Sequence, residues 1–483
     1  MSQLILGAMV RTIGAYPSGW RYPGAHRDPR RDADALRHTA TVAEAARLDY
    51  LFFGDWLATG HDLEFVDPYL VARIDPLSAV TYLAAHTTRI GLIATADTNF
   101  ADPYALARAT SSADVLSGGR IGLNLVTAVD PRSAANHGQD FHTANGSRYD
   151  RAVEFEQVLR RLWDSFDDDA IVADVASGVF LDATRLHATD FHGEHLSVAG
   201  PLNALRPVQG HLPIVHSGTS ARSRLFAAQS ADLALVAVND LEHARSIREE
   251  LRALAYESGR DDRTLKVIAP VLPIVGETRA HAQAIAEDLA ELVQVAEDWP
   301  SGPPAGFPPQ RSLTQLASHV GVDLTGRSPD DLVGPELVAR FGEAGQMLVE
   351  IVAERTGRTP AGERPPSLRQ LLVAASVNAS MIVGTASEIA DEFEAWGDAG
   401  AVDGFNVLSA VQPAQFDAFA LGVVPELQRR GVFPAEYEGE TLREHLGLER
   451  PENVHAAGRD AGLLAAHGAD RGRRRAEAPP RRS

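Results

Sequence analysis

Polar side chains stand at the ends of several short apolar segments in this chain. Amide, hydroxyl and carboxylate groups at such positions can hydrogen-bond a polar ligand. One such residue is more often structural than functional, but five groups at equivalent positions favour a binding or catalytic site. The groups are Asp55, Thr98 with Asn99, Asn124 with Thr127, residues 216–220, and Asn406.

The turn at residues 217–220, with the sequence SGTS, is the best candidate for holding a phosphate group. It offers backbone N–H groups and hydroxyls, and a predicted helix carrying Arg222 and Arg224 follows it. The N-terminus of a helix attracts anions through unpaired N–H groups and the helix dipole. The alternative interpretation is that Ser220 is an ordinary helix N-cap.

Three histidines in one loop, His187, His192 and His195, could suggest a metal site. They lack the i, i+4 spacing of ligands on a helix, and the sequence places no carboxylate partner among them. We therefore interpret them as solvent-exposed residues and predict no metal. Arg21, which follows the first apolar segment, could hold a carboxylate or pair with a surface acid.

Eight strands are predicted, five of them carry the polar groups, and helical patterns separate the strands. Residues 148–166 are strongly amphipathic, and the glycines at 118 and 119 are expected to end another helix. This alternation predicts an α/β fold, a (β/α)8 TIM barrel whose strand ends converge on one mouth. The strands are expected at residues 4–10, 50–54, 89–94, 120–127, 212–215, 233–238, 265–275 and 404–408.

Two segments interrupt the alternation, at about residues 167–210 and 299–366. We predict that both are insertions at the barrel mouth, where lids form. The barrel would then occupy residues 1–448. Residues 449–483 are rich in Ala, Arg, Gly and Pro and are expected to be a disordered tail.

The composition excludes several classes of protein. The 483 residues include no cysteine, which rules out disulfides and thiolate chemistry and fits a reducing cytoplasm. The net charge of −20 argues against nucleic-acid binding. No apolar run approaches the roughly 20 residues of a membrane span, and the N-terminus does not resemble a signal peptide. The GxxxxGK[ST], HExxH, GxSxG and GxGxxG motifs are absent.

Ten sequence motifs, spread in order along nearly the whole chain, match those of one known family. The chain resembles the flavin-dependent monooxygenases related to bacterial luciferase. The most similar branch contains nitrilotriacetate monooxygenase component A, the sulfone monooxygenase of thiophene desulfurisation and the pristinamycin IIA synthase large subunit. Among the motifs are GWRYPG (19–24), FFGD (52–55), LSGGRIGLNLVT (116–127), RYDRAVEFEQVLRRLWDS (148–165), GPLNALRPVQGHLPIVHSGTS (200–220) and GAVDGFNVL (400–408).

The resemblance implies a luciferase-like barrel that binds FMN in its reduced form, FMNH2. It also implies a separate flavin reductase as partner, a small-molecule substrate, and a homo-oligomer, either a dimer or a tetramer. Oxygen would add to the reduced flavin to give a C4a-(hydro)peroxide that oxygenates the substrate. By motif, Asp55 and Thr98 would lie at the flavin, Asn124 would lie beside it, and Tyr149, Thr219 and Ser220 would hold its phosphate.

Four positions depart from the common pattern of these relatives. Asn145 stands where a histidine is usual, Asn99 replaces a threonine, His216 replaces a glutamine, and Ser223 replaces a glycine. Asn145 can still donate a hydrogen bond but cannot carry charge, so weaker FMN binding is expected. No residue is assigned as the catalytic proton donor.

Two other functions compete with the monooxygenase. One is an oxidoreductase of the same superfamily that uses the deazaflavin F420 as a hydride carrier; the motif match argues against it. The other is a non-catalytic flavin-binding barrel, which the changes at positions 99 and 145 allow. The mouth loops permit an anionic or aromatic substrate without selecting one.

Overall fold

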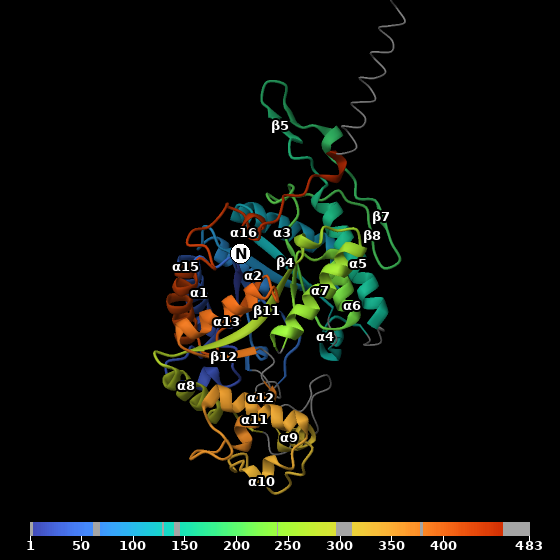
Figure 1. Ribbon diagram of the computed structural model, residues 1–483. Coiled ribbons are helices and arrows are strands. Elements are labelled where there is room, and N and C mark those ends of the chain that lie inside the picture. Colours follow the sequence, from blue (N-terminus) through green and yellow to red (C-terminus); the bar gives the residue numbers. More distant parts are fainter. Residues whose placement is uncertain are drawn as a thin grey trace, which may run out of the picture.

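The structure is a computed structural model that describes residues 3–60, 68–127, 130–139, 145–238, 240–295, 312–376 and 380–456. Its centre is a closed barrel of eight parallel strands in the order β10-β9-β4-β3-β2-β1-β13-β11, which closes because β10 also pairs with β11 (Figure 1). This confirms the predicted TIM barrel. The strands are β1 (Ile5–Met9), β2 (Tyr50–Phe53), β3 (Gly91–Asp97), β4 (Ile121–Val126), β9 (Ile214–Ser217), β10 (Leu233–Leu235), β11 (Lys266–Val275) and β13 (Gly404–Leu408).

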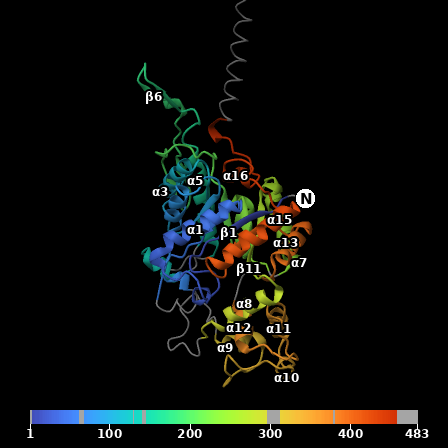
Figure 2. The same ribbon diagram turned by 90° about the vertical axis from the view of Figure 1, so that its left-hand side faces the viewer.

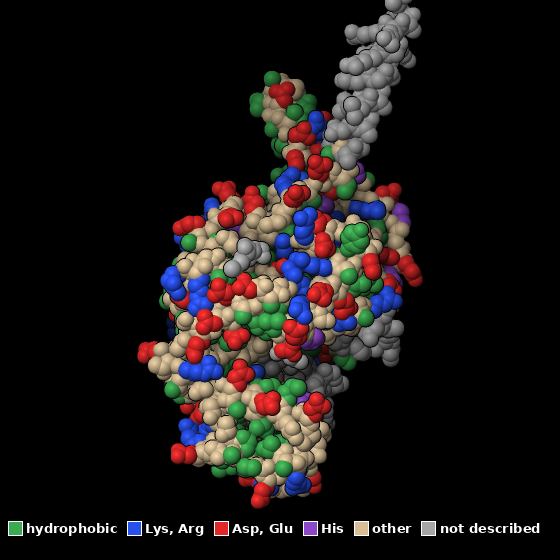
Figure 3. Space-filling view, in the orientation of Figure 1, with side chains coloured by type: hydrophobic (Ala, Val, Ile, Leu, Met, Phe, Trp, Pro, Cys, Tyr) green, Lys and Arg blue, Asp and Glu red, His purple; other side chains and the backbone are tan. Residues whose placement is uncertain are grey.

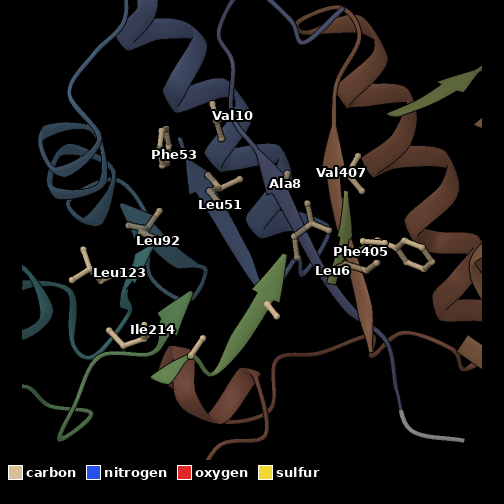
Figure 4. Packing of buried hydrophobic residues seen from close by; sticks show 14 of the residues in the cluster. Leu6, Ala8, Val10, Leu51, Phe53, Leu92, Leu123, Ile214, Phe405 and Val407 are labelled. Atoms are coloured by element: carbon tan, nitrogen blue, oxygen red, sulfur yellow. The ribbon is translucent and has the colours of Figure 1, made fainter. Parts of the chain in front are cut away.

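The barrel strands are buried on both faces, so they appear in the sequence as nearly continuous apolar runs. Side chains such as Leu6, Leu51 and Leu123 point outward and pack against the helices (Figure 4). The alternate side chains, such as Tyr50 and Ile93, fill the barrel interior. Gly7 is required beside Tyr50, since an added Cβ would lie 2.0 Å from the tyrosine ring.

Helices cover the outside of the barrel, and several begin at an Asp-Pro pair. The Asp75 and Asp102 carboxylates cap α2 and α3 by accepting backbone N–H groups. α3 ends at Gly118, whose φ of 72° favours glycine. The covering helices are α1 (Asp32–Ala45), α2 (Pro76–Ala84), α3 (Pro103–Ser117), α4 (Pro131–Asn136), α5 (Asn145–Trp163), α6 (Ala221–Ser230), α7 (Leu241–Glu257), α13 (Ala386–Asp398), α14 (Ala414–Ala418) and α15 (Val424–Arg430). α16 (Leu442–His445) closes the amino-terminal end of the barrel with Leu442.

A helical insert lies between β11 and α13, at the carboxyl end of the strands (Figures 1 and 2). It has an apolar core of its own around Val320, Val349 and Leu371. Its last element is β12, which adds a ninth strand to the barrel sheet by pairing with the second half of β11. This strand was not predicted. The insert consists of α8 (Arg279–Glu291), α9 (Leu313–Val320), α10 (Pro335–Val338), α11 (Glu343–Thr356), α12 (Leu368–Ser376) and β12 (Ser380–Gly384). Part of the predicted insertion, residues 299–311, lies outside the described residues.

The other insertion is not at the mouth as predicted, because helix α5 runs back along the barrel to its amino-terminal end. The β5–β6 hairpin (Ile171–Asp174 and Val179–Leu181) follows α5 and projects from that end (Figures 1 and 2). At its base, Arg206 pairs with Asp168 at 3.2 Å. A second small hairpin, β7–β8 (Phe191–His192 and Ser197–Val198), is held on the outer side of α5 by the Glu154 carboxylate. Because the β5–β6 hairpin projects from the end opposite the barrel mouth, it cannot act as a lid.

Part of the predicted tail is packed against this amino-terminal end. Arg450 pairs with Asp168 at 2.8 Å, and the Asn453 amide donates to the Phe166 carbonyl oxygen at 2.9 Å. These polar anchors hold residues 449–456, and residues 457–483 lie outside the described part of the chain. Among the helices that the structure describes, we find none with the length and apolar character needed to cross a membrane.

Candidate active site at the barrel mouth

Polar residues from four neighbouring strands form one arc of the carboxyl-terminal rim. Asp55 follows β2, Thr98 follows β3, Asn124 lies near the end of β4, and the turn at 217–220 follows β9. These strands are consecutive in the barrel. Tyr149 joins them from α5, where its ring lies edge-on to His216 at 6.1 Å. We call Asp55, Thr98, Asn124, Tyr149, Thr219 and Ser220 the polar arc.

Asn124 is the member of the polar arc with an unused buried group. Its side chain points into the barrel and donates from Nδ2 to the Thr95 hydroxyl at 2.9 Å. Its Oδ1 atom is buried and has no hydrogen-bond partner among the described residues. A buried carbonyl oxygen without a donor costs about 1–3 kcal/mol, so its retention here points to a ligand that donates to it.

Thr98 fixes the loop after β3. Its backbone N–H and its hydroxyl both donate to the Val126 carbonyl oxygen, at 2.9 and 3.2 Å. Its own carbonyl oxygen accepts from Arg151 Nε of α5 at 3.0 Å. Thr98 is fully buried. Its hydrogen bonds tie the ends of β3 and β4 to α5. A ligand on this part of the rim would meet a rigid wall.

Asp55 is partly buried at the end of β2. Burial raises the pKa of its carboxyl above the usual range, while the Trp56 N–H at 2.7 Å and the nearby Arg73 favour the ionised form. Arg73 stacks on Tyr69, with its guanidinium carbon 4.6 Å from the ring centre. Asp55 thus offers an acceptor to the mouth from a position held by its surroundings.

The turn at 217–220 satisfies both interpretations made from the sequence. Ser220 is the N-cap of α6, since its Oγ accepts the Ser223 N–H at 3.2 Å. Thr219 and Ser220 are nevertheless exposed, and the first N–H groups of a helix have no intrahelical partner. The turn is tight, because a Cβ on Gly218 would lie 2.1 Å from Ser223 Oγ. The turn is therefore capped and still has donors available for an anion.

His216 is a neutral residue that links four elements. Its Nδ1 is 2.7 Å from the Leu125 carbonyl oxygen and its Nε2 is 2.9 Å from Ser223 Oγ. Since a carbonyl oxygen can only accept, Nδ1 carries the proton and Nε2 accepts from the serine hydroxyl. Burial lowers the pKa of His216 to about 4. With both nitrogens occupied, His216 positions β4, β9, α5 and α6 and is not a free base.

The lowered pKa of His216 predicts a loss of stability in acid. The unfolded chain, with a histidine pKa near 6.5, binds more protons than the folded chain between about pH 4 and 6.5. The free energy of unfolding should therefore fall by about 2 kcal/mol between pH 7 and 4.5 through this group alone. His216→Gln should remove that part of the decrease in urea unfolding measured at both pH values.

The matched control for this measurement is His319→Gln, which changes an exposed histidine of α9. It should keep the pH response of the unmodified chain. An unchanged response in His216→Gln would show that the buried imidazole is not the group that titrates.

The loop histidines, which the sequence predicts to be solvent-exposed, and Arg21 are not members of the polar arc. His187 pairs with Asp167 at 3.1 Å, and His192 lies 3.2 Å from Asp190, both away from the polar arc. In the described ranges, no group of three or more histidine or acidic side chains is arranged to hold a metal. Arg21 donates to the carbonyl oxygen of Leu292.

Two further candidates remain less defined. Asn145 is the first residue of α5, but its side chain lies outside the described part of the structure. Asn406 points into the barrel like Asn124, and its Oδ1 is also buried without a partner among the described residues.

Two residues that support the site, Thr95 and Arg151, were not predicted from the sequence. Thr95 lies two residues before Asp97 on the inward face of β3, and an alternation of period two could have identified it. Arg151 lies two residues after Tyr149, and nothing in its spacing predicts that it reaches back to β3.

A closed (β/α)8 barrel with polar groups gathered on its carboxyl rim defines a TIM-barrel enzyme. The luciferase-like monooxygenase family matches residues 17–403, and the chain belongs to this family. Monooxygenases are oxidoreductases, so the chain is an enzyme of that class. The resemblance inferred from the motifs is confirmed.

Three relatives illustrate the match. The N-acetyl-S-(2-succino)cysteine monooxygenase of Bacillus subtilis is 35% identical over 94% of this chain and 98% of its own length. Nitrilotriacetate monooxygenase component A of Aminobacter aminovorans is 34% identical, over 93% of this chain and 98% of its own. The solved structure of a riboflavin lyase with modified FMN and riboflavin superposes with a TM-score of 0.74 at 26% identity, covering 93% of this chain and 97% of that one.

Proposed function

We propose that this chain is the oxygenating component of a two-component monooxygenase. It would use FMNH2 supplied by a separate flavin reductase, together with O2, to oxygenate a small organic substrate in the cytoplasm. The relatives support this proposal: one is named as a component of a monooxygenase, and the riboflavin lyase structure contains a modified FMN. The observation that carries the proposal is Asn124 Oδ1, which has no partner among the described residues and lies on the same arc as the exposed N-terminus of α6.

The polar arc fits the two ends of FMN. The phosphate would bind at the start of α6, where Thr219, Ser220 and the first backbone N–H groups meet the Tyr149 side chain. Asn124 Oδ1 would accept a hydrogen bond from an N–H group of the flavin ring. When bound, reduced FMN supplies the electrons that activate O2.

The chain's own contribution is to hold the cofactor and exclude water. Thr98 and Arg151 hold the rim rigid between β3, β4 and α5, which would keep the ring in one orientation. Below the rim, the interior is packed with apolar side chains, including Ile93 and Val215. The helical insert stands at the same end of the barrel (Figure 1). A dry site limits side reactions of reactive species with water.

The experiment that tests this proposal mixes the purified chain with reduced FMN, O2 and a flavin reductase, and follows flavin reoxidation. We expect reoxidation of bound flavin to be slower than that of free FMNH2, and labelled oxygen to enter a substrate from a screen. Hydride exchange with F420 in place of these signals would support the F420-dependent alternative. Retention of FMN with neither activity would mean that the chain is a flavin-binding barrel.

We also propose that the chain forms a homodimer through its amino-terminal face. The β5–β6 hairpin exposes apolar side chains on this face, with Val175 96% and Phe180 67% exposed (Figure 3). Leu205 and Val208 lie on either side of Arg206, which pairs with Asp168 at the hairpin base, and both are exposed. Leu116 near the end of α3 is exposed as well, and we call these three residues the apolar patch. A two-fold dimer could seat each hairpin on the partner's patch, and an isolated two-stranded hairpin gains stability from such a contact.

Sedimentation velocity can test this dimer. The double variant Val175→Asp, Phe180→Asp should sediment as a monomer, because each carboxylate would be buried in the apolar contact. Met347→Asp changes an exposed apolar residue on the helical insert at the opposite end and should remain dimeric. A dimeric double variant, or a monomeric unmodified chain, would contradict the proposed interface.

A further inference from the structure

Asn406 lies in the same layer of the barrel interior as Asn124, on the opposite wall. The inward side chains of a TIM barrel form layers of four from alternate strands, and the tilt of the strands shifts each layer by one residue per strand. Followed through the strand registers in this way, the layer of Asn124 continues to Phe52 on β2, Asn406 on β13 and Leu235 on β10. Three strands separate β4 from β13 in either direction around the closed barrel. The two amides therefore face each other across the interior.

The Asn406 side chain is buried without any hydrogen bond to a described residue. It is 1% exposed, and its Oδ1 is fully covered and has no donor in the described part of the chain. Asn124 differs in that its Nδ2 is used by the Thr95 hydroxyl. A buried amide oxygen without a donor destabilises the fold, whereas the leucine at the equivalent place on β10, Leu235, has no such requirement. An amide kept at this position is therefore better explained by a ligand than by packing.

The Tyr50 hydroxyl is a second buried group that lacks a partner on this side of the barrel. Gly7 of β1 pairs with Tyr50 on one side and with Asn406 on the other. The tyrosine ring lies across Gly7, because its Cζ atom is 2.1 Å from the place of a Cβ there. The hydroxyl oxygen, one bond beyond Cζ, is buried and has no partner among the described residues. An unused donor and an unused acceptor thus approach Gly7 from its two sides.

The open space of the barrel mouth begins one layer above Asn406. By the same registers, the next layer toward the mouth consists of Met9, Thr95, Ser217 and Pro270. Met9 and Pro270 belong to the two strands that flank β13, and both are partly exposed. Since helices cover the outside of the barrel, inward side chains near the carboxyl end are exposed toward the mouth. A molecule that fills the mouth would therefore reach the layer of Asn406.

We propose that Asn406 and Tyr50 bind a neutral polar group of the substrate, a hydroxyl or a carboxamide. Such a group can donate to Asn406 Oδ1 and accept from the Tyr50 hydroxyl at the same time. A carboxylate has no hydrogen to donate, and the eight side chains of the two layers carry no charge that would compensate it. The assignment to the substrate rests on the proposed function, which places the flavin at Asn124 and leaves the opposite wall, at β13, to the molecule that is oxygenated.

The first test uses the full-length chain without flavin, so it is independent of the proposed reaction. Benzamide carries a neutral carboxamide, and benzoate is its charged counterpart of similar shape. Benzamide should raise the Tm of the unmodified chain, whereas sodium benzoate should raise it no more than sodium chloride at the same ionic strength. Asn406→Leu should abolish the rise with benzamide. Gln346→Leu, which changes an exposed amide of α11 in the helical insert, should keep it.

The stability of these variants separates a binding role from a structural one. Without benzamide, Asn406→Leu should be at least as stable as the unmodified chain, because an apolar side chain replaces an amide that has no partner. Asn453→Leu is the matched comparison and should lower the Tm, since both Nδ2 and Oδ1 of this buried amide are hydrogen-bonded. A lower Tm for Asn406→Leu as well would mean that a bound water joins Asn406 to Tyr50 as part of the fold. That result, or the absence of any effect of benzamide, would overturn the proposal.

The second test uses the complete system with reductase, FMN and a panel of substrates. Alcohols and carboxamides should be oxygenated in preference to the matching carboxylic acids. Asn406→Leu and Tyr50→Phe should each raise the KM for these neutral substrates by about tenfold, the effect of one lost hydrogen bond, and should not raise it for analogues that lack the polar group. Weaker binding of FMN by Asn406→Leu would assign the residue to the cofactor and overturn the proposal. If no substrate is oxygenated, the proposed function fails, while the benzamide titration still decides the role of Asn406.

Discussion

Ser220→Asp should weaken FMN binding by more than 100-fold. Aspartate is as good an N-cap as serine, so α6 should keep its start and its stability. The new carboxylate would stand where the proposed phosphate binds, and two like charges about 4 Å apart repel by about 4 kcal/mol at an effective dielectric constant of 20. Isothermal titration of the purified chain with FMN measures the change directly.

Two further variants at Ser220 separate the cap from the ligand. Ser220→Ala removes both a cap and a ligand donor, so we expect weaker FMN binding by about 1–2 kcal/mol together with a lower Tm. Ser220→Asn keeps the cap and stays neutral, and should retain most of the affinity. Equal FMN affinity in the Asp and Asn variants would show that no phosphate binds at this turn.

Arg120→Met should lower the free energy of unfolding by about 4 kcal/mol, the largest effect on stability that we expect. Arg120 lies just before β4 and is 2% exposed. Its guanidinium ties the end of α3 to the loop between α2 and β3. The variant would leave several buried carbonyl oxygens without donors, because Arg120 donates to the Ser117, Ile90, Ala84 and Thr87 carbonyl oxygens and to the Thr87 hydroxyl.

Urea unfolding of the unmodified chain and of the Arg120→Met variant measures this difference in the free energy of unfolding. Arg108→Met is the matched control, since Arg108 is exposed on the same helix α3. Its effect should be within about 0.5 kcal/mol of zero, as for most surface changes. A loss below about 1 kcal/mol in Arg120→Met would mean that water replaces the lost donors, and that Arg120 does not hold this region together.

Much of the barrel could be predicted from local patterns. A strand buried on both faces must be apolar almost throughout, so each of the eight strands is visible without knowledge of its neighbours. The Asp-Pro pairs at 75–76 and 102–103 begin helices, because aspartate caps them and proline needs no N–H partner there. The polar residues at the strand ends followed from the rule that parallel strands carry their sites at the carboxyl end.

Contacts between distant segments could not be predicted in this way. The position of the β5–β6 hairpin depends on where α5 ends, and that end is set by how the helix packs along the barrel. β12 was missed because its edge pairing with β11 follows from the docking of the insert. The neutral state of His216 depends on Leu125, which is 91 residues away in the chain.

The barrel, its family and the residues on the rim could all be predicted from the amino-acid sequence. Burial, capping and strand-end polarity are local properties, and they leave their pattern in neighbouring residues. Which rim groups have hydrogen-bond partners is visible only in the folded chain: Asn124 Oδ1 has none among the described residues, while both nitrogens of His216 are occupied. Hydrogen bonding and charge compensation depend on distances across the closed barrel, and those distances exist only once the chain has folded.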